Sequence, residues 1–151
     1  MFKHILAATD GTARSSEAVT LAARLARALG AKLTVVNARE PFLPMYPDWG
    51  GGYAPMIAQD DFDRAVKAGS EEILAGAKRL AAVEKVECQT VSVASDLPWR
   101  AILDCAADQG CDAIVMASHG RKGIEGMMLG SETHKVLIHS SLPVLVTRSS
   151  P

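Results

Sequence analysis

The chain has 151 residues, a formal net charge of −1 and a pI near 6.4, and 48% of its residues are hydrophobic. This length fits one domain, residues 1–151, with a single continuous core. The near-neutral charge argues against nucleic-acid binding, because domains that bind nucleic acids are usually clearly basic. The apolar runs are all shorter than the roughly 18 residues that a membrane-spanning helix needs, which argues against a membrane protein.

The cysteines indicate the cellular setting. Cys88, Cys105 and Cys111 form an odd set without a C-x-x-C spacing, so a disulfide framework or a zinc site is not expected. The segment that starts at Met1 leads into a strand and lacks the apolar stretch of a signal peptide. We therefore expect a cytoplasmic protein with buried, inert thiols.

Hydrophobic periodicity and end signals predict strands and helices in alternation. In chain order they are a strand over 2–8, a helix from Ser15 or Ser16 to 29, a strand over 32–38, a helix from 60 or 61 to 82, a strand over 86–93, a helix from about 96 to 109, a strand over 113–117, a helix over 131–139 and a strand over 144–147. This order predicts a Rossmann-like α/β fold: a five-stranded, parallel, doubly wound sheet of order 3-2-1-4-5 with helices on both faces.

Residues 39–60 interrupt the alternation. They hold four of the seven prolines, four of the seven aromatic residues and the run Gly50-Gly51-Gly52. A connection this long exceeds what the fold requires. Two interpretations stay open: a surface excursion that packs locally or against a second subunit, and a lid that folds over a ligand.

The predicted strand order puts a topological switch between the first and fourth strands, where open α/β sheets bind their ligands. The ends that meet there carry Thr9-Asp10-Gly11 and the segment 116–120. A loop with glycines at 120, 123, 126 and 130 follows and leads to Ser131 at a helix start. Glycines let a backbone approach a ligand closely, and helix N-termini attract anions. The sequence therefore predicts a site for a nucleotide phosphate.

Neither G-x-x-x-x-G-K-[ST] nor a G-x-G-x-x-G after the first strand is present. The chain instead shows Ala117-x2-Gly120-x9-Gly130-Ser131, together with Lys-His-Ile-Leu-Ala-Ala-Thr-Asp-Gly near its start and Pro-Val-Leu-Val-Thr-Arg near its end. Over essentially its whole length it resembles a universal stress protein of the branch that carries G-x2-G-x9-G-[ST] and binds nucleotides. Ala117 departs from that motif's first glycine, and we expect its methyl group to alter the fit without blocking the site.

The resemblance implies ATP or AMP as ligand, with Mg or Mn where the nucleotide carries it. The implied adenine and ribose contacts are Ala8, Thr9, Asp10, the backbone of Ala38, and Met116. The implied phosphate contacts are Ala117, Gly120, Gly130, Ser131, Glu132 and Thr133, with His119 and Arg121 added. Asp10 is the candidate to help hold a nucleotide-bound cation; no metal site of the protein's own is expected. Several of these residues also have plain structural interpretations, among them a turn cap for Asp10 and core packing for Met116.

The last strand, around residues 144–146, is an apolar sheet edge, and such edges invite pairing with another chain. The resemblance likewise implies a homodimer through this strand, with no nucleic acid and no membrane as partner. Three functions follow as hypotheses: a stress-response sensor or regulator that binds ATP or AMP with little turnover, a slow ATPase, and a dimeric interaction module that has lost nucleotide binding. No catalytic residues are assigned, since neither a nucleophile elbow nor a Cys–His pair is found.

Overall fold

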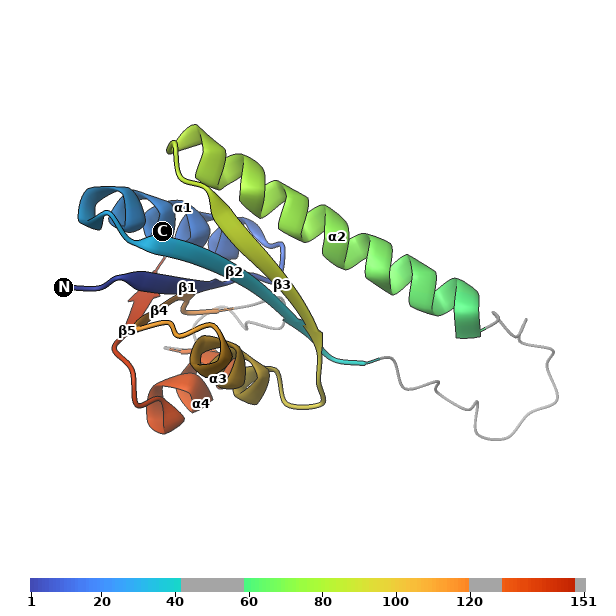
Figure 1. Cartoon of the computed structure of the whole chain (residues 1–151). Helices are drawn as coiled ribbons and strands as arrows, with labels where there is room; N and C mark the ends of the chain where they lie inside the picture. Colours follow the sequence, from blue (N-terminus) through green and yellow to red (C-terminus); the bar gives the residue numbers. More distant parts are fainter. Residues whose placement is uncertain (42–58, 120–128, 149–151) are drawn as a thin grey trace, which may run out of the picture.

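The computed structural model describes residues 1–41, 59–119 and 129–148. These residues form five strands and four helices in strict alternation (Figure 1): β1 (His4–Ala8), α1 (Ala13–Leu29), β2 (Lys32–Arg39), α2 (Gln59–Val83), β3 (Cys88–Ala94), α3 (Pro98–Asp108), β4 (Ala113–Ala117), α4 (Ser131–His139) and β5 (Val144–Thr147). Each predicted element is present, with bounds shifted by a few residues at most.

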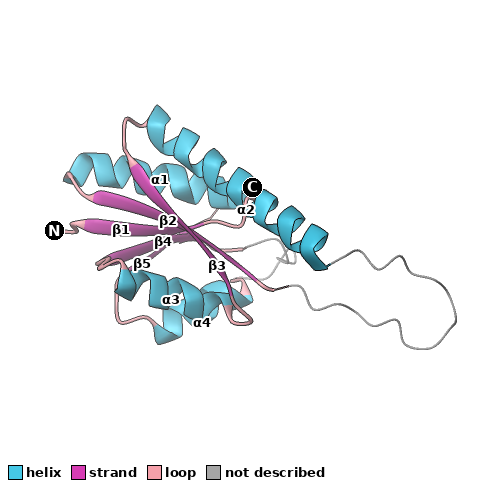
Figure 2. Ribbon diagram, turned by 45° about the vertical axis from the view of Figure 1, so that its right-hand side comes forward, coloured by secondary structure: helices cyan, strands magenta, loops and turns pink. Residues whose placement is uncertain are grey.

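The five strands make one parallel sheet of order β3-β2-β1-β4-β5 (Figure 2), which confirms the predicted topology. Ala7 of β1 pairs with Val35 of β2 on one side and with Val115 of β4 on the other. The carboxyl ends of β2 and β4 therefore lie on either side of β1 at the switch point, with β2 extending to Arg39 and β4 to Ala117.

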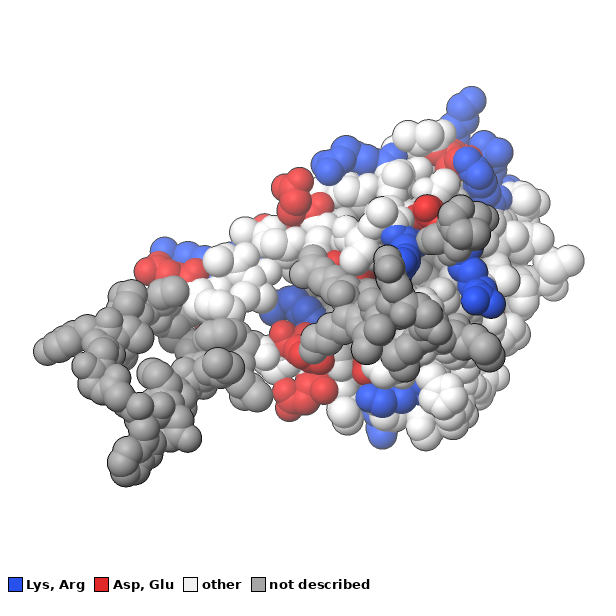
Figure 3. Space-filling view, turned by 180° about the vertical axis from the view of Figure 1, so that it is seen from behind, with Lys and Arg blue, Asp and Glu red and all other residues white. Residues whose placement is uncertain are grey.

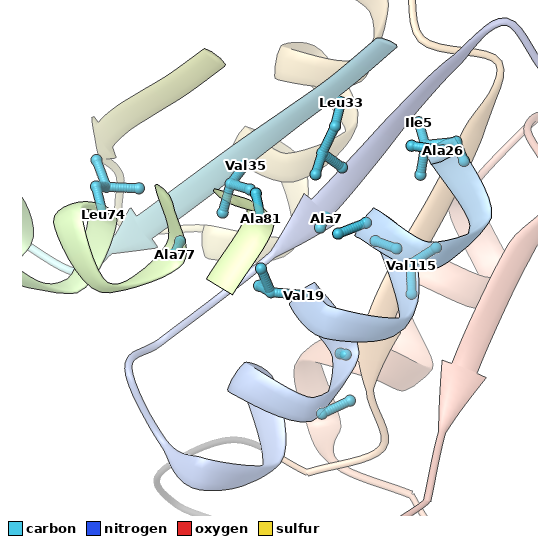
Figure 4. Packing of buried hydrophobic residues seen from close by; sticks show 14 residues of the cluster. Ile5, Ala7, Val19, Ala26, Leu33, Val35, Leu74, Ala77, Ala81 and Val115 are labelled. Atoms are coloured by element: carbon cyan, nitrogen blue, oxygen red, sulfur yellow. The ribbon is translucent and has the colours of Figure 1, made fainter. Parts of the chain in front are cut away.

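Helices α1 and α2 cover one face of the sheet. Alanines of α1 and α2 pack with Val19 and Leu74 against the side chains of β1, β2 and β4 (Figure 4). Ala18, Val19, Ala22 and Ala23 are 0% exposed. Small side chains at three- and four-residue spacing let these helices approach the sheet closely and bury the stripe that the sequence predicts.

Helices α3 and α4 cover the other face. Ile102 and Ala106 of α3 and Val136 of α4 pack with Leu6, Val36, Ile114 and Met116. Trp99 of α3 stacks on His139 of α4, with 4.7 Å between the ring centroids. Because successive side chains of a strand point to opposite faces, the two clusters divide β1 between them: Ile5 and Ala7 belong to one, Leu6 and Ala8 to the other.

Two helix starts differ from the prediction. Helix α1 begins at Ala13, and its N-cap is Thr12, whose side chain accepts from the Ser15 backbone N–H at 3.3 Å. The predicted caps, Ser15 and Ser16, instead lie in the first turn, where each hydroxyl donates to the Thr12 carbonyl oxygen at 3.0 Å. Helix α3 has Leu97 as its N-cap, without a side-chain hydrogen bond, and Pro98 sets its first turn.

Helix α2 is the longest element, and its first turns extend beyond the edge of the sheet (Figure 1). Most of the predicted 39–60 connection, residues 42–58, lies outside the described residues. The two interpretations of that segment therefore stay predictions.

The three cysteines are free. Cys105 and Cys111 are buried, as expected, whereas Cys88 is only partly buried, which differs from the expectation. Burial raises the pKa of the Cys111 thiol to about 11, with further contributions from Cys105 and Asp112. A thiol protonated at neutral pH is a poor nucleophile, which agrees with the predicted inert role. Across the described ranges, no helix is both long and apolar enough to span a membrane.

The amino end of the sheet is closed by side-chain hydrogen bonds. The Asp112 carboxylate accepts the backbone N–H groups of Lys3 at 2.7 Å and His4 at 3.1 Å. These bonds lower the pKa of Asp112 from its usual value, since they favour the charged form. The ring Nε2 of His4 lies 2.8 Å from Thr34 Oγ1, so the buried hydroxyl of Thr34 in β2 also has a partner.

Candidate functional site

A pocket of about 770 Å³ opens at the carboxyl ends of β1, β2 and β4. This volume falls in the range of small-molecule sites, roughly 300–1,000 Å³. Helix α2 contributes one wall, and the first turns of α3 and α4 contribute another. The pocket thus lies at the topological switch point, where the sequence predicts a ligand.

The predicted site residues gather around this pocket. Eleven of them line it: Ala8, Thr9, Asp10, Ala38, Met116, Ala117, His119, Gly130, Ser131, Glu132 and Thr133. The other two, Gly120 and Arg121, lie outside the described residues. Residues from four separate stretches of chain therefore meet at one place, although their binding role is still a prediction.

Asp10 follows β1 and shapes the turn into α1. Its Oδ1 accepts from the backbone N–H of Thr12 at 3.0 Å and from the Thr12 hydroxyl at 2.6 Å. Thr9 beside it is 7% exposed, and its Oγ1 lies 3.0 Å from Ser15 Oγ. The turn-cap interpretation of Asp10 thus holds in geometry, and the same residue lines the pocket, so the two roles are compatible.

Gly130 joins the start of α4 to the end of β4. Its backbone N–H donates to the Ser118 carbonyl oxygen at 2.6 Å. A Cβ placed on Gly130 would lie 2.9 Å from that oxygen and 3.3 Å from the His119 Cα. Because both contacts are with backbone, the neighbours cannot swing away. Glycine is needed here for the close approach of two chain segments, whereas its φ of −67° would suit any residue.

The first turn of α4 lines the pocket without a side-chain cap, because its N-cap is Gly130. Helix N-termini carry unpaired N–H groups and a partial positive charge, which favour anions. The Thr133 hydroxyl is already engaged: it donates to the Ala117 carbonyl oxygen at 2.9 Å, and the residue is 3% exposed. Thr133 therefore ties α4 to β4, and the backbone of this turn is the part suited to a phosphate.

Ala117 and Met116 belong to the core as well as to the pocket wall. Ala117 packs in the α1–α2 cluster and Met116 in the α3–α4 cluster, with exposures of 7% and 6%. The methyl group that departs from the family motif is thus part of the sheet's packing. This placement explains how alanine is accommodated at the position of the first motif glycine.

His119 sits just past β4. Its Nδ1 lies 3.1 Å from Ser118 Oγ, while its Nε2 is buried and has no hydrogen-bond partner among the described residues. A buried polar atom without a partner is uncommon in proteins. Since His119 lines the pocket, this nitrogen is a candidate for hydrogen bonding to a ligand.

Glu132 has its carboxylate occupied by the protein. It accepts from the backbone N–H of Trp99 at 2.9 Å and pairs with Lys135 Nζ at 3.1 Å. The carboxylate thus satisfies a donor at the start of α3 and links the first turns of α3 and α4. Its negative charge would repel a phosphate placed directly beside it. The predicted phosphate contact of Glu132 would therefore be made by its backbone.

Sequence reasoning missed further residues that line the pocket, among them the polar residues Asn37, Arg39 and Ser70. Asn37 Nδ2 donates to the Thr9 carbonyl oxygen at 2.9 Å, and Ser70 Oγ donates to Asn37 Oδ1 at 2.8 Å. Ser70 Oγ also lies 2.6 Å from Ser92 Oγ. One buried amide therefore joins β1, β2 and α2. The signal was an asparagine among the apolar residues Val35, Val36 and Ala38 of the strand, which predicts a buried polar role.

Arg39 ends β2, and its Nε is buried without a partner among the described residues.

On the face seen from behind in Figure 3, acidic and basic side chains are interspersed, and both kinds lie beside the hollow at the base of the projecting part of α2. Within the described stretches, no cluster of three or more His, Cys, Asp or Glu side chains has the arrangement of a metal site.

Comparisons with known proteins agree with this architecture. The model of the universal stress protein family matches residues 1–148. Universal stress protein YxiE of Bacillus subtilis is 36% identical over 149 residues, which cover 98% of this chain and 100% of the relative. A universal stress protein of Thermus aquaticus is 33% identical over 98% of this chain and 100% of its own length.

Solved structures show the same fold. A universal stress protein in complex with cAMP has a TM-score of 0.72 and 25% identity, with 99% of each chain covered. The universal stress protein of Archaeoglobus fulgidus in complex with dAMP has a TM-score of 0.62 and 23% identity, with 97% of each chain covered.

Proposed function

This chain belongs to the universal stress protein family, and on that premise we propose that it binds ATP or AMP in the pocket at the switch point and acts as a cytoplasmic stress-response sensor or regulator with little turnover. One observation carries the proposal: the two buried side-chain nitrogens without partners in the described chain, on Arg39 and His119, both line that pocket.

The shape and chemistry of the pocket support a nucleotide. The apolar side chains of Val36, Ile102 and Met116 form part of its wall and suit the face of a nucleobase. The uncapped first turn of α4 and His119 Nε2 suit a phosphate. The adenine nucleotide in the complex of the related protein supports the same ligand class for this chain. Asp10 is the residue proposed to help hold a nucleotide-bound Mg or Mn.

Released ligand and direct binding test this proposal. The protein would be purified without added nucleotide, denatured, and the supernatant analysed by chromatography and mass spectrometry. Emptied protein would then be titrated calorimetrically with AMP, with ATP, and with ATP plus Mg. Released adenine nucleotide or saturable binding is the expected result. An absence of both at near-millimolar ligand would contradict the proposal and leave the interaction-module hypothesis.

Turnover is tested in the same preparation. Release of inorganic phosphate from Mg-ATP is expected to be negligible over hours. Metal-dependent release that is abolished in Asp10→Ala would establish the slow ATPase in place of a sensor.

We also propose a homodimer formed through β5. This strand is an edge of the sheet, and Leu145 on it is 44% exposed. Leu137 and Ile138 of the adjacent α4 are 40% and 61% exposed. Exposed apolar side chains beside an unpaired strand edge favour association with a second copy.

Light scattering coupled to size-exclusion chromatography tests the dimer. The wild-type protein is expected at twice the chain mass, and Leu145→Lys is expected to shift it toward the monomer, since two like charges would face each other across a two-fold axis. Val83→Lys is the matched control, because Val83 is 77% exposed at the end of α2, away from β5. A wild-type monomer at micromolar concentration would rule the proposal out.

A further inference from the structure

Arg39 lines the pocket and has a buried side-chain donor that none of the described residues satisfies. It is the last residue of β2 and pairs with Ala94 of β3. Its side chain is partly exposed, while its Nε is buried and lacks a hydrogen-bond acceptor among the described residues. A guanidinium is always charged and offers donors only. A buried donor without an acceptor is costly, so a ligand that supplies an acceptor would relieve that cost.

The sheet register places Arg39 opposite the phosphate end of the pocket. Val35 and Val115 both pair with Ala7, and Arg39 and His119 each follow four residues later. Because β1 separates β2 from β4, the two strands run about 10 Å apart at the usual strand spacing. Both unpartnered nitrogens belong to residues that line one pocket, so a single ligand can hydrogen-bond to both, provided that it presents an acceptor to Arg39.

The surroundings distinguish the two ends. The end near His119 has the first turn of α4, which suits a phosphate. The side of the pocket formed by β2 and α2 includes Ala38, Val66 and Gly69 and also the carboxylates Glu40 and Glu72. Arg39 Nε hydrogen-bonds to neither carboxylate, and their negative charges disfavour a phosphate on this side, which leaves it to the uncharged base. A purine carries ring-nitrogen acceptors, and a guanidinium is suited to donate to the edge of such a base.

We propose that Arg39 is a specificity-determining residue that donates hydrogen bonds to the acceptor edge of the purine, while the α4 end of the pocket holds the phosphate. This inference rests on the proposed nucleotide function and adds to it the residue that reads the base. It also gives a role to a charged side chain at the carboxyl end of a strand whose middle residues, 33–37, are buried.

The test compares two ligands that differ only in the base: AMP and ribose 5-phosphate. Their affinities would be measured calorimetrically for the wild-type protein, for Arg39→Met and for Arg39→Lys. Arg39→Met keeps a long apolar stem and removes the donors. It is expected to weaken AMP binding about tenfold or more, the loss typical of one hydrogen bond to a charged group. Ribose 5-phosphate binding is expected to change less than about twofold on the same reasoning.

The conservative variant Arg39→Lys and one control variant complete the design. Arg39→Lys keeps the charge but loses the planar donor fork, so it is expected to restore only part of the AMP affinity. Lys32→Met is the matched control, because it removes the same charge from the exposed, opposite end of β2 and is expected to leave both affinities unchanged.

The remaining outcomes each decide against the inference. Equal weakening of AMP and ribose 5-phosphate by Arg39→Met would assign Arg39 to the phosphate or ribose. Unchanged AMP affinity would remove it from the site. A wild-type protein that binds no nucleotide would overturn the proposed function and this inference together, whereas the first two results would leave the proposed function standing.

Discussion

The two ends of the sheet differ in how completely the protein satisfies its own polar groups. At the amino end, Asp112 accepts two backbone N–H groups and His4 pairs with Thr34. At the carboxyl end, the buried nitrogens of Arg39 and His119 have no partner in the described chain. The same strands and the same parallel pairing supply both ends. Under the proposed function, a bound nucleotide would supply the partners that these two nitrogens lack at the carboxyl end.

The carboxyl end is itself assembled in two ways. Near β4, a backbone contact between Gly130 and Ser118 joins the start of α4 to the end of the strand. Near β2, side-chain hydrogen bonds of Asn37 to Thr9 and Ser70 join the strand to β1 and α2. A backbone contact tolerates no added atom, whereas a side-chain network can be altered in steps. The following variants test these differences, from the largest expected effect to the smallest.

Gly130→Ala is expected to have the largest effect. The added methyl group would lie 2.9 Å from the Ser118 carbonyl oxygen, so the start of α4 must move. We expect a loss of about 2–3 kcal/mol in the free energy of unfolding, as for other overpacked sites, and at least tenfold weaker nucleotide binding, since about 1.4 kcal/mol corresponds to that factor.

Chemical denaturation and calorimetric titration measure both effects of Gly130→Ala. Gly76→Ala is the control, because Gly76 lies within α2 and its added Cβ meets only a flexible arginine end at 3.7 Å. This control is expected to be stabilised slightly, by about 0.5–1 kcal/mol. Equal stability changes for the two glycines would mean that the close approach at Gly130 is unimportant.

Asn37→Ala is expected to lower the free energy of unfolding by about 2 kcal/mol, because it leaves the Thr9 carbonyl and the Ser70 hydroxyl each without one buried partner. Urea denaturation gives the change, and Ser92→Ala on the neighbouring strand is a milder comparison, since Ser70 then keeps its bond to Asn37. If Asn37→Ala costs less than Ser92→Ala, the amide is not the centre of the network.

Ala117→Gly restores the motif glycine and tests whether the methyl group matters for the ligand. Ala117 packs in the α1–α2 cluster and is 7% exposed. We therefore expect a stability loss of about 1 kcal/mol, from glycine in a strand and the lost burial, with nucleotide affinity within about threefold of wild type. A large gain in affinity in titration would show instead that the methyl group obstructs the site.

Asp112→Asn at the amino end is expected to have the smallest effect at neutral pH and no effect on binding. The pKa of Asp112 is lowered in the folded protein by the backbone N–H groups of Lys3 and His4. Its charge therefore contributes stability above the unfolded value of 3.8, and this contribution is lost as the pH falls through the folded pKa. When the pH is lowered from 6 to 2, the unfolding temperature is expected to fall less steeply for the variant than for the wild type. Identical profiles would mean that these bonds do not depend on the charge.

The sequence by itself determined the alternation of strands and helices, the parallel sheet and its order, and the place of the pocket. It did so because hydrophobic periodicity fixes which face of each element is buried, and parallel strands need crossover helices of one hand. The family resemblance then located eleven pocket-lining residues from 8 to 133.

Only the tertiary structure decided what each group does at the site. The sequence placed glycine at 130 but did not show that its missing Cβ makes room for the Ser118 carbonyl. It did not show that the Thr133 hydroxyl and the Glu132 carboxylate are already engaged, or that Arg39 keeps a buried donor without a partner. Hydrogen bonds between residues distant in the chain depend on how strands and helices come together, and no local pattern encodes that geometry.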